Sequence, residues 1–237
     1  MGNQIGLNKL RGADALVKAI KELKIKHVFG ILGGSIMTVY DAFYGMDDVK
    51  LFTFKHEQAA IHAADAYARV LKKPGVVMVT SGPGATNLVT GLANAYMDSS
   101  PLVAVTGQVS TEILGRDGFQ ETDIIGVTFP ITKFNYMVKS AGEIPSAFRL
   151  AYNVAMAGRP GPVLIDIPKD LQNADFIEDK DIGKKINIDK LYPLEPNLEE
   201  VLRAVEILLN SERPVILVGG GVYWSGAWNE VIEIAEF

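Results

Sequence analysis

The sequence predicts an α/β fold, in which a parallel sheet carries helices on both faces and the start of a second α/β domain follows. Two observations lead to this prediction. Short, continuous apolar runs such as 76–80 (VVMVT) and 102–106 (LVAVT) are typical of strands that are buried on both faces. Segments with apolar residues at helical spacing, such as 12–24, alternate with these runs along the chain.

The individual elements follow from the same patterns in order. Apolar runs predict strands at 27–31, 51–54, 76–80, 102–106, 136–139 and 163–167. Periodic apolar positions or helix-forming composition predict helices at 12–24, 36–44, from Glu57 to about residue 69, 85–97 and 145–157. The helix at Glu57 is supported by its many alanines, since alanine has the highest helix propensity.

We predict three parts in the chain: an N-terminal domain at 1–172, a linker at 173–196 and a truncated start of a central α/β domain at 197–237. The linker is polar and shows no periodicity. The last part contains a predicted helix at 198–209, strand at 214–218, turn at 219–221 and helix at 227–237. About forty residues are too few to close such a core, so we expect the chain to be a fragment.

The composition limits the classes of function. The chain has 237 residues, of which 48% are hydrophobic and 22% charged, as in globular proteins. Its net charge of −5 argues against a nucleic-acid partner. There is no apolar run long enough to span a bilayer and no signal-peptide core, so we expect a cytoplasmic protein with no membrane partner. The absence of cysteine excludes thiol catalysis, and the spacing of the three histidines does not indicate a metal site.

Function is expected in the loops after the predicted strands, because open α/β sheets bind ligands at the carboxyl ends of their strands. These loops are 32–35, 55–57, 81–84, 107–120 and 168–169. Glu57 begins a helix whose dipole favours an ionised carboxylate, while its small apolar surroundings oppose ionisation. A carboxylate that handles protons needs such a balance. The simpler interpretation is an ordinary charge in a first helical turn.

The other candidate positions also have two interpretations. Gly33 and Gly34 allow close approach of a ligand, or form a plain tight turn. Phe119 would line a substrate site and Gln120 would hydrogen-bond the substrate, or both would only anchor the loop. Lys169 would hold an anion, or face solvent. The glycines at 219–221 lack the dinucleotide fingerprint because Trp224 occupies its last glycine position, so a nicotinamide dehydrogenase is a distant alternative.

Seven motifs occur in order along the first domain. They are GGS at 33–35, HEQAAIHAADAYAR at 56–69, TSGPGATN at 80–87, GQV at 107–109, FQETDI at 119–124, ITK at 131–133 and GRPGPVLIDIPKD at 158–170. With these motifs, residues 12–171 resemble the N-terminal, pyrimidine-binding domain of thiamine-diphosphate enzymes. Within that group they most resemble the catalytic subunit of acetohydroxyacid (acetolactate) synthase. Leu32, Ala66 and Phe134 depart from the usual residues of that family.

The resemblance implies a role for each site residue. Glu57 resembles the glutamate that hydrogen-bonds the aminopyrimidine ring of the cofactor and so promotes loss of the thiazolium C2 proton. The catalytic residues would be Glu57, Gly34, which borders the reacting centre, and Gln120. The cofactor-binding residues would be Glu57, Thr80, Pro83, Asn87 and Gln120, with Arg159 contacting a structural FAD. Phe119 and Lys169 would line the substrate channel.

The resemblance also implies an activity in branched-chain amino acid biosynthesis. The enzyme would be a transferase that decarboxylates pyruvate and passes the two-carbon unit to a second 2-keto acid. It would use thiamine diphosphate, Mg²⁺ and FAD, with the Mg²⁺ and diphosphate sites in a C-terminal part that is absent here. A homodimer or larger assembly with a possible regulatory subunit would be expected, and the fragment alone would be inactive.

Other functions remain open at this point. The chain would also suit another thiamine-diphosphate enzyme, such as pyruvate oxidase, a 2-keto-acid decarboxylase or sulfoacetaldehyde acetyltransferase. A non-catalytic module that associates with a complete subunit is an alternative of a different class.

Overall fold

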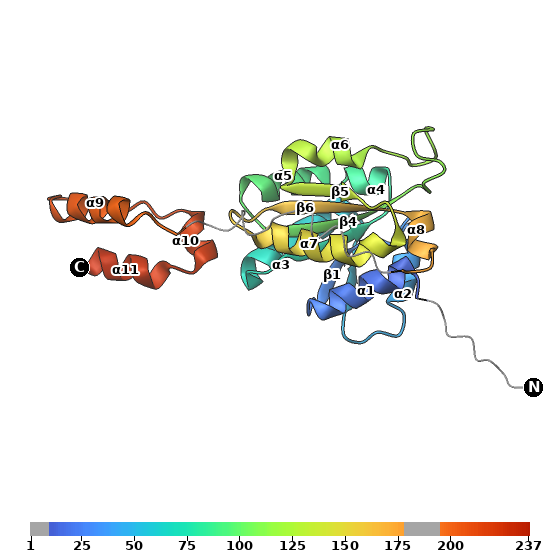
Figure 1. Cartoon of the computed structure of the whole chain (residues 1–237), viewed down its shortest axis with the longest axis horizontal. Coiled ribbons are helices and arrows are strands. Elements are labelled where there is room, and N and C mark those ends of the chain that lie inside the picture. The colour runs from blue at the N-terminus through green and yellow to red at the C-terminus, as the bar shows by residue number, and fades with distance from the viewer. Residues whose placement is uncertain (1–9, 178–194) are drawn as a thin grey trace, which may run out of the picture. The chain divides into compact units, whose positions relative to one another are not determined.

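The first of two compact units in the chain contains a parallel sheet. The computed structural model describes residues 10–177 and 195–237, and the units are Met1–Ile188 and Asp189–Phe237. The first unit has a six-stranded sheet with the order β2-β1-β3-β4-β6-β5, in which all neighbouring strands are parallel (Figure 1). The predicted fold class, a parallel sheet between helices, is therefore confirmed.

The strands and helices of this unit lie close to their predicted positions. The strands are β1 (His27–Gly30), β2 (Lys50–Thr53), β3 (Gly75–Val79), β4 (Leu102–Gln108), β5 (Phe134–Met137) and β6 (Pro162–Pro168). The helices are α1 (Gly12–Glu22), α2 (Met37–Ala42), α3 (Glu57–Leu71), α4 (Pro83–Thr86), α5 (Val89–Met97), α6 (Ile124–Thr128), α7 (Ile144–Met156) and α8 (Lys169–Asn173). Two 3₁₀ turns, Phe129–Ile131 and Ala141–Glu143, precede β5 and α7.

The central strands are largely apolar because each of them contributes to two cores. In β3, Val76 and Met78 point into one core, whereas Val77 and Val79 point into the other. Strand side chains alternate between faces, so a strand that is covered on both sides is apolar at most positions. This requirement explains why continuous apolar runs predicted β3 and β4 correctly.

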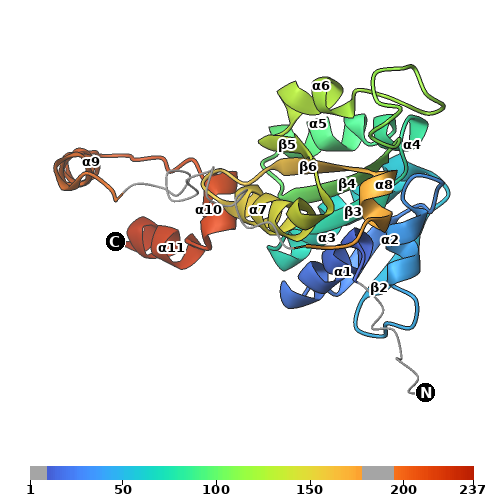
Figure 2. The same cartoon turned by 45° about the vertical axis from the view of Figure 1, so that its right-hand side comes forward.

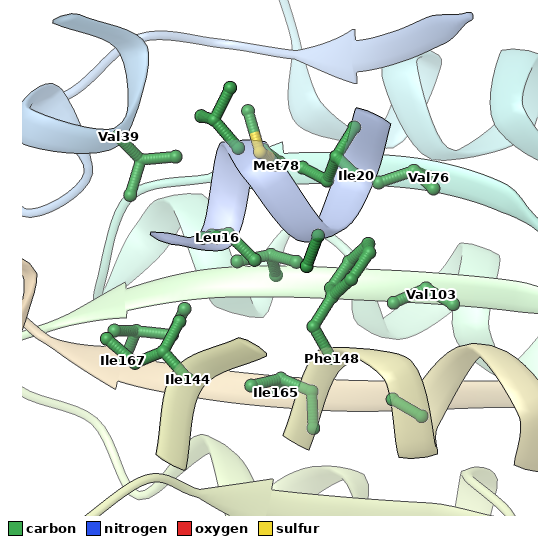
Figure 3. Close-up of a cluster of buried hydrophobic side chains, with 14 of the residues drawn as sticks. Leu16, Ile20, Val39, Val76, Met78, Val103, Ile144, Phe148, Ile165 and Ile167 are labelled. Carbon is green, nitrogen blue, oxygen red and sulfur yellow. The ribbon is translucent and has the colours of Figure 1, made fainter. Parts of the chain in front are cut away.

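Helices cover the two faces as separate pairs. The helices α1 and α7 pack together on one face, and α3 and α5 pack together on the other (Figure 1, Figure 2). On the first face, Leu16 and Ile20 of α1 meet Phe148 of α7 above Val103 of β4 (Figure 3). These four side chains are all fully buried. The sheet and its helix pairs thereby hold the carboxyl ends of the strands in fixed positions.

Some elements differ from their predictions. The predicted helix at 85–97 is two helices, α4 and α5, because α4 already ends at Thr86 and Asn87 lies at its C-cap. The short helices α6 and α8 were not predicted, since five residues show too little periodicity. The beginning of the predicted linker is ordered: the Gly12 N–H donates to the Ala174 carbonyl at 3.0 Å. Residues 178–194 of that linker lie outside the described residues.

The second unit contains helices α9 (Leu198–Leu209), α10 (Gly220–Ser225) and α11 (Trp228–Glu236). The predicted helices at 198–209 and 227–237 are confirmed. The predicted strand at 214–218 was wrong, because residues 195–237 include no other extended segment that pairs with it, and Leu217 is 97% exposed. The predicted turn at 219–221 was also wrong in part, since Gly220 begins α10. None of the described helices is long and apolar enough to cross a membrane.

Candidate active site

Glu57 is the first residue of α3 and lies beyond the carboxyl end of β2. His56 caps the helix, since its Nδ1 accepts a hydrogen bond from the Gln58 N–H at 3.1 Å. The half-buried Glu57 side chain accepts a hydrogen bond at Oε2 from Asn87 Nδ2 at 2.9 Å. Its other oxygen, Oε1, lies 3.6 Å from the position that a Cβ would take at Gly84. The amide of Asn87 therefore orients the carboxylate, and glycine leaves room beside it.

The loop after β1 packs against the residues that follow β3. Gly33 is required there, because a Cβ would lie only 2.5 Å from the Cβ of Thr80. The Ser35 N–H donates to Thr80 Oγ1 at 3.1 Å, and the Ser35 hydroxyl accepts from Ser81 Oγ at 2.9 Å. Gly34 lies between these contacts, is exposed and has no atom within 4 Å of its Cβ position. Its backbone is thus held in place while it remains open to a ligand.

Gln120 reaches this region from the long loop after β4. Gly82 has a φ of +56°, and a Cβ on it would lie 2.7 Å from the Gln120 carbonyl oxygen. Gln120 itself has a φ of +60°, an uncommon conformation for a residue with a side chain. The structure therefore brings Gln120 beside the turn that carries Thr80 and Gly84. Positive φ values of this kind recur at functional sites.

The remaining predicted residues occupy more exposed positions. Phe119, next to Gln120, is 89% exposed. Pro83 is exposed at the first position of α4, and Lys169 is exposed at the first position of α8, after β6. Strands β1, β2, β3, β4 and β6 are parallel, so these residues belong to the same edge of the sheet as Glu57.

Arg159 lies at the opposite edge of the sheet. It precedes β6, and its guanidinium donates to Ser99 Oγ at 2.6 Å and to the Met97 carbonyl at 3.1 Å. Met97 and Ser99 precede β4, so these contacts lie at the amino ends of the strands. The structure does not bring Arg159 together with Glu57.

Sequence reasoning missed several residues that hold the site together. Ser35 and Ser81 were recognised only as parts of turns. Gln172 of α8 is fully buried, and its Nε2 donates to the carbonyl oxygens of Ser35 at 2.7 Å and Ile167 at 2.9 Å. Asp166 was quoted only inside a motif, although a carboxylate within the apolar run VLIDI is a signal that could have singled it out.

Comparisons with known proteins show which family the first part of the chain resembles. Residues 10–127 match the family described as thiamine pyrophosphate enzyme, N-terminal TPP binding domain. The chain is 48% identical over 96% of its length to a probable acetolactate synthase large subunit of Methanocaldococcus jannaschii, of which it covers 39%.

Residues 10–127 belong to the N-terminal domain family of the thiamine pyrophosphate enzymes. Two other relatives of this chain are acetolactate synthase large subunits. That of Corynebacterium glutamicum is 45% identical over the whole chain, which covers 38% of it. That of Haemophilus influenzae is 38% identical over 97% of the chain, which covers 40% of it. The chain thus spans about two fifths of the length of these relatives.

The side chains around Glu57 have the chemistry to hold one side of thiamine pyrophosphate, the group after which the matched family is named. A carboxylate oxygen beside a glycine can accept a hydrogen bond from a flat heterocycle that carries N–H groups, and Asn87 fixes its orientation. Gly34 and Gly84 remove the side chains that would otherwise occupy the adjoining space.

Proposed function

We propose that this chain supplies the pyrimidine-binding side of the active site of an acetolactate synthase. The enzyme would decarboxylate pyruvate and transfer the two-carbon unit to a second 2-keto acid, in branched-chain amino acid biosynthesis. The observation that carries the proposal is the Glu57 carboxylate, which Asn87 orients at the carboxyl edge of the sheet with Oε1 beside Gly84. The similarity to acetolactate synthase large subunits supports this choice of reaction.

Thiamine diphosphate, when bound, supplies an electron sink for the decarboxylation. Glu57 Oε1 would accept a hydrogen bond from a pyrimidine ring nitrogen and would hold or release the proton there. Asn87 keeps Oε2 occupied, so that only one carboxylate oxygen faces the ring. Thr80, Pro83 and Gln120 would contact or orient the cofactor, Gly34 would border the reacting centre, and Phe119 and Lys169 would line the path of the 2-keto acid.

The other components of the enzyme are part of the same proposal. Mg²⁺ and the diphosphate would be held outside these residues, so the chain alone would be inactive. Arg159 would contact a structural FAD at a place separate from Glu57. The enzyme would be a cytoplasmic homodimer or larger assembly. The relatives are named large subunits, which supports a smaller, regulatory partner.

The test is the substitution Glu57→Gln in the whole enzyme that contains this chain. Glutamine keeps the shape and still accepts a hydrogen bond from Asn87, but it cannot take up a proton. We expect kcat for acetolactate formation to fall by about 10²–10⁴-fold, the usual contribution of a positioned acid or base. Glu112→Gln, in the exposed part of the loop after β4, is the matched control and should leave kcat unchanged.

The products distinguish the alternatives. Formation of acetolactate from pyruvate supports the synthase. Accumulation of acetaldehyde would indicate a decarboxylase, and consumption of oxygen would indicate an oxidase. Unchanged turnover in Glu57→Gln would exclude the proposed role of the carboxylate in any of these enzymes.

A further inference from the structure

Asp166 is a buried carboxyl group that the proposed function does not use. It lies in β6 and is 1% exposed. Oδ1 accepts a hydrogen bond from Thr106 Oγ1 at 2.7 Å, and Oδ2 accepts one from Gln108 Nε2 at 3.0 Å. Both donors belong to β4, which pairs with β6 so that Thr106 lies opposite Asp166. Asp166 is therefore fixed in the interior of the protein by two different side chains.

Gln108 connects Asp166 to both ends of the loop 109–123. Its Nε2 also donates to the Thr122 carbonyl oxygen at 2.9 Å, and its Oε1 accepts from the Val109 N–H at 2.9 Å. The loop begins at Val109 and its last residues precede α6 at Ile124. Every strong donor and acceptor of this amide is used, so its orientation is determined. The Gln108 side chain thereby joins the two ends of the loop.

Other contacts make the same loop a compact unit. The Glu121 carboxylate accepts hydrogen bonds from the N–H groups of Gly115 and Gly118. The Thr111 N–H donates to Asp170 Oδ1 at 3.0 Å. Farther along, the Gln120 backbone lies against Gly82. A shift at the base would consequently move Phe119 and Gln120 relative to the site.

The base of the loop depends on hydrogen bonds because a cavity of about 630 Å³ adjoins it. Gln108, Asp166 and Thr122 line this cavity, together with the charged residues Glu121, Asp123 and Lys139. Apolar side chains around such a space have fewer partners than in a packed core, so packing contributes less to its shape. The bonds of Gln108 are then the contacts that hold the two ends of the loop together.

We propose that Asp166 is a positioning residue, which acts through Gln108 to place the loop 109–123 and with it Phe119 and Gln120. The inference rests on the proposed function for the roles of Phe119 and Gln120. A buried carboxylate needs hydrogen-bond partners, but donors within the core would be enough to satisfy it. Here one donor, Gln108, also bonds both ends of a loop that belongs to the site. Gln108 is aimed at Asp166, Thr122 and Val109 together.

Asp166→Asn tests the proposal with almost no change in shape. The asparagine oxygen would keep the bond from Thr106, and its Nδ2 would then face the Gln108 Nε2, donor against donor. A flipped Gln108 amide would instead give up its bonds to Val109 and Thr122. In both cases the base of the loop loses at least one buried hydrogen bond, which is worth about a tenfold change in an opening equilibrium.

The measurement is amide hydrogen exchange of this chain at pH 8. We expect exchange in residues 109–123 to become about tenfold faster in Asp166→Asn. Thr106→Val is the matched control, because it removes the other hydrogen bond to Asp166 and leaves the Gln108 contacts intact; exchange in the loop should stay as in the wild type. Gln108→Met removes the three hydrogen bonds of Gln108, including the one to Asp166 Oδ2, but keeps the Asp166 carboxyl group. It should reproduce the faster exchange even if Asp166→Asn does not fold.

Enzyme kinetics give a second test of the same proposal. In the whole enzyme, Asp166→Asn should raise KM for the 2-keto acid and lower kcat, because the Phe119–Gln120 segment is no longer held in place. Equal loop exchange in Asp166→Asn and Thr106→Val would overturn the proposal, and so would faster exchange with unchanged kinetics. Because Glu57→Gln tests the proposed function independently, a failure of the positioning role of Asp166 can be separated from a failure of that function.

Discussion

Asp166 places an ionisable group inside an otherwise apolar strand, so protonation there is linked to folding. Burial is the main cause that raises the pKa of its carboxyl to about 7, and the nearby Asp123 adds to this, against the opposing hydrogen bonds from Thr106 and Gln108. The ordinary pKa of an aspartate carboxyl, which we take for the unfolded chain, is 3.8. Between these values the folded protein holds a proton that the unfolded chain releases, so the free energy of unfolding falls as the pH rises from about 4 to 7.

We therefore predict that Asp166→Asn removes part of the pH dependence of stability. From pH 5 to pH 8 the wild type should lose on the order of 3 kcal/mol relative to the variant. Urea unfolding of both proteins at these two pH values measures the difference. The carboxyl groups of Asp14 and Glu22, whose pKa values are lowered by Arg11 and Arg149, titrate alike in both proteins and cancel. Equal changes in the two proteins would contradict the prediction.

Among the site residues, the ones that sequence reasoning grouped correctly are those at strand ends. Glu57 and Asn87 are thirty positions apart, yet both follow strands of one parallel sheet, and the topology brings them to one edge. The contacts of Asp166 could not be predicted in this way, because they require Thr106 to lie opposite Asp166 in the pairing of β4 with β6. Residue patterns indicate that strands exist, but they do not determine how adjacent strands align.

At the scale of elements, a helix or strand was predicted correctly when its own residues carry the pattern that stabilises it. Strand β3 and the first four residues of β4 are covered on both faces and are apolar. The segment 214–218 has the same composition but no strand beside it among residues 195–237, and it remains unpaired. A strand obtains its hydrogen bonds from neighbours, so composition alone cannot form one.

The crossing of α3 and α5 gives a prediction at this scale. A Cβ on Gly91 would lie 2.2 Å from Ile61 Cγ2. Gly91→Ala should destabilise the protein by about 1–3 kcal/mol through overpacking, which exceeds the gain of up to about 1 kcal/mol in helix propensity. Thermal or urea unfolding measures this cost.

A second substitution shows whether the cost comes from that contact. Ile61→Ala removes Cγ2 and opens a cavity, so it destabilises by about 2–5 kcal/mol alone. In the double variant the new methyl group occupies part of that space. The loss of stability of the double variant should therefore be smaller than the sum of the two single losses by about 0.5–3 kcal/mol. Strict additivity would show that the crossing relaxes without the Ile61 contact.

At the scale of the whole molecule, the two units differ in how much apolar surface they bury. All the buried hydrophobic residues of the described chain lie between Ala13 and Ile167. The second unit contains none, and Val205, Leu208, Ile216, Ile234 and Phe237 are among the residues that line an open cavity of about 860 Å³ there. A unit of this size without its own core contributes little to its own stability.

We predict that deleting residues 189–237 leaves the unfolding of the first unit unchanged but removes most binding of the apolar dye 8-anilinonaphthalene-1-sulfonate. The dye should bind the intact chain because Leu209, at the end of α9, is 65% exposed and Phe237, just after α11, is 99% exposed. Urea midpoints followed by circular dichroism, with dye fluorescence on the same samples, measure both effects. A lower midpoint in the shortened chain would show that the first unit draws stability from residues 189–237. Undiminished fluorescence would place the exposed apolar surface on the first unit instead.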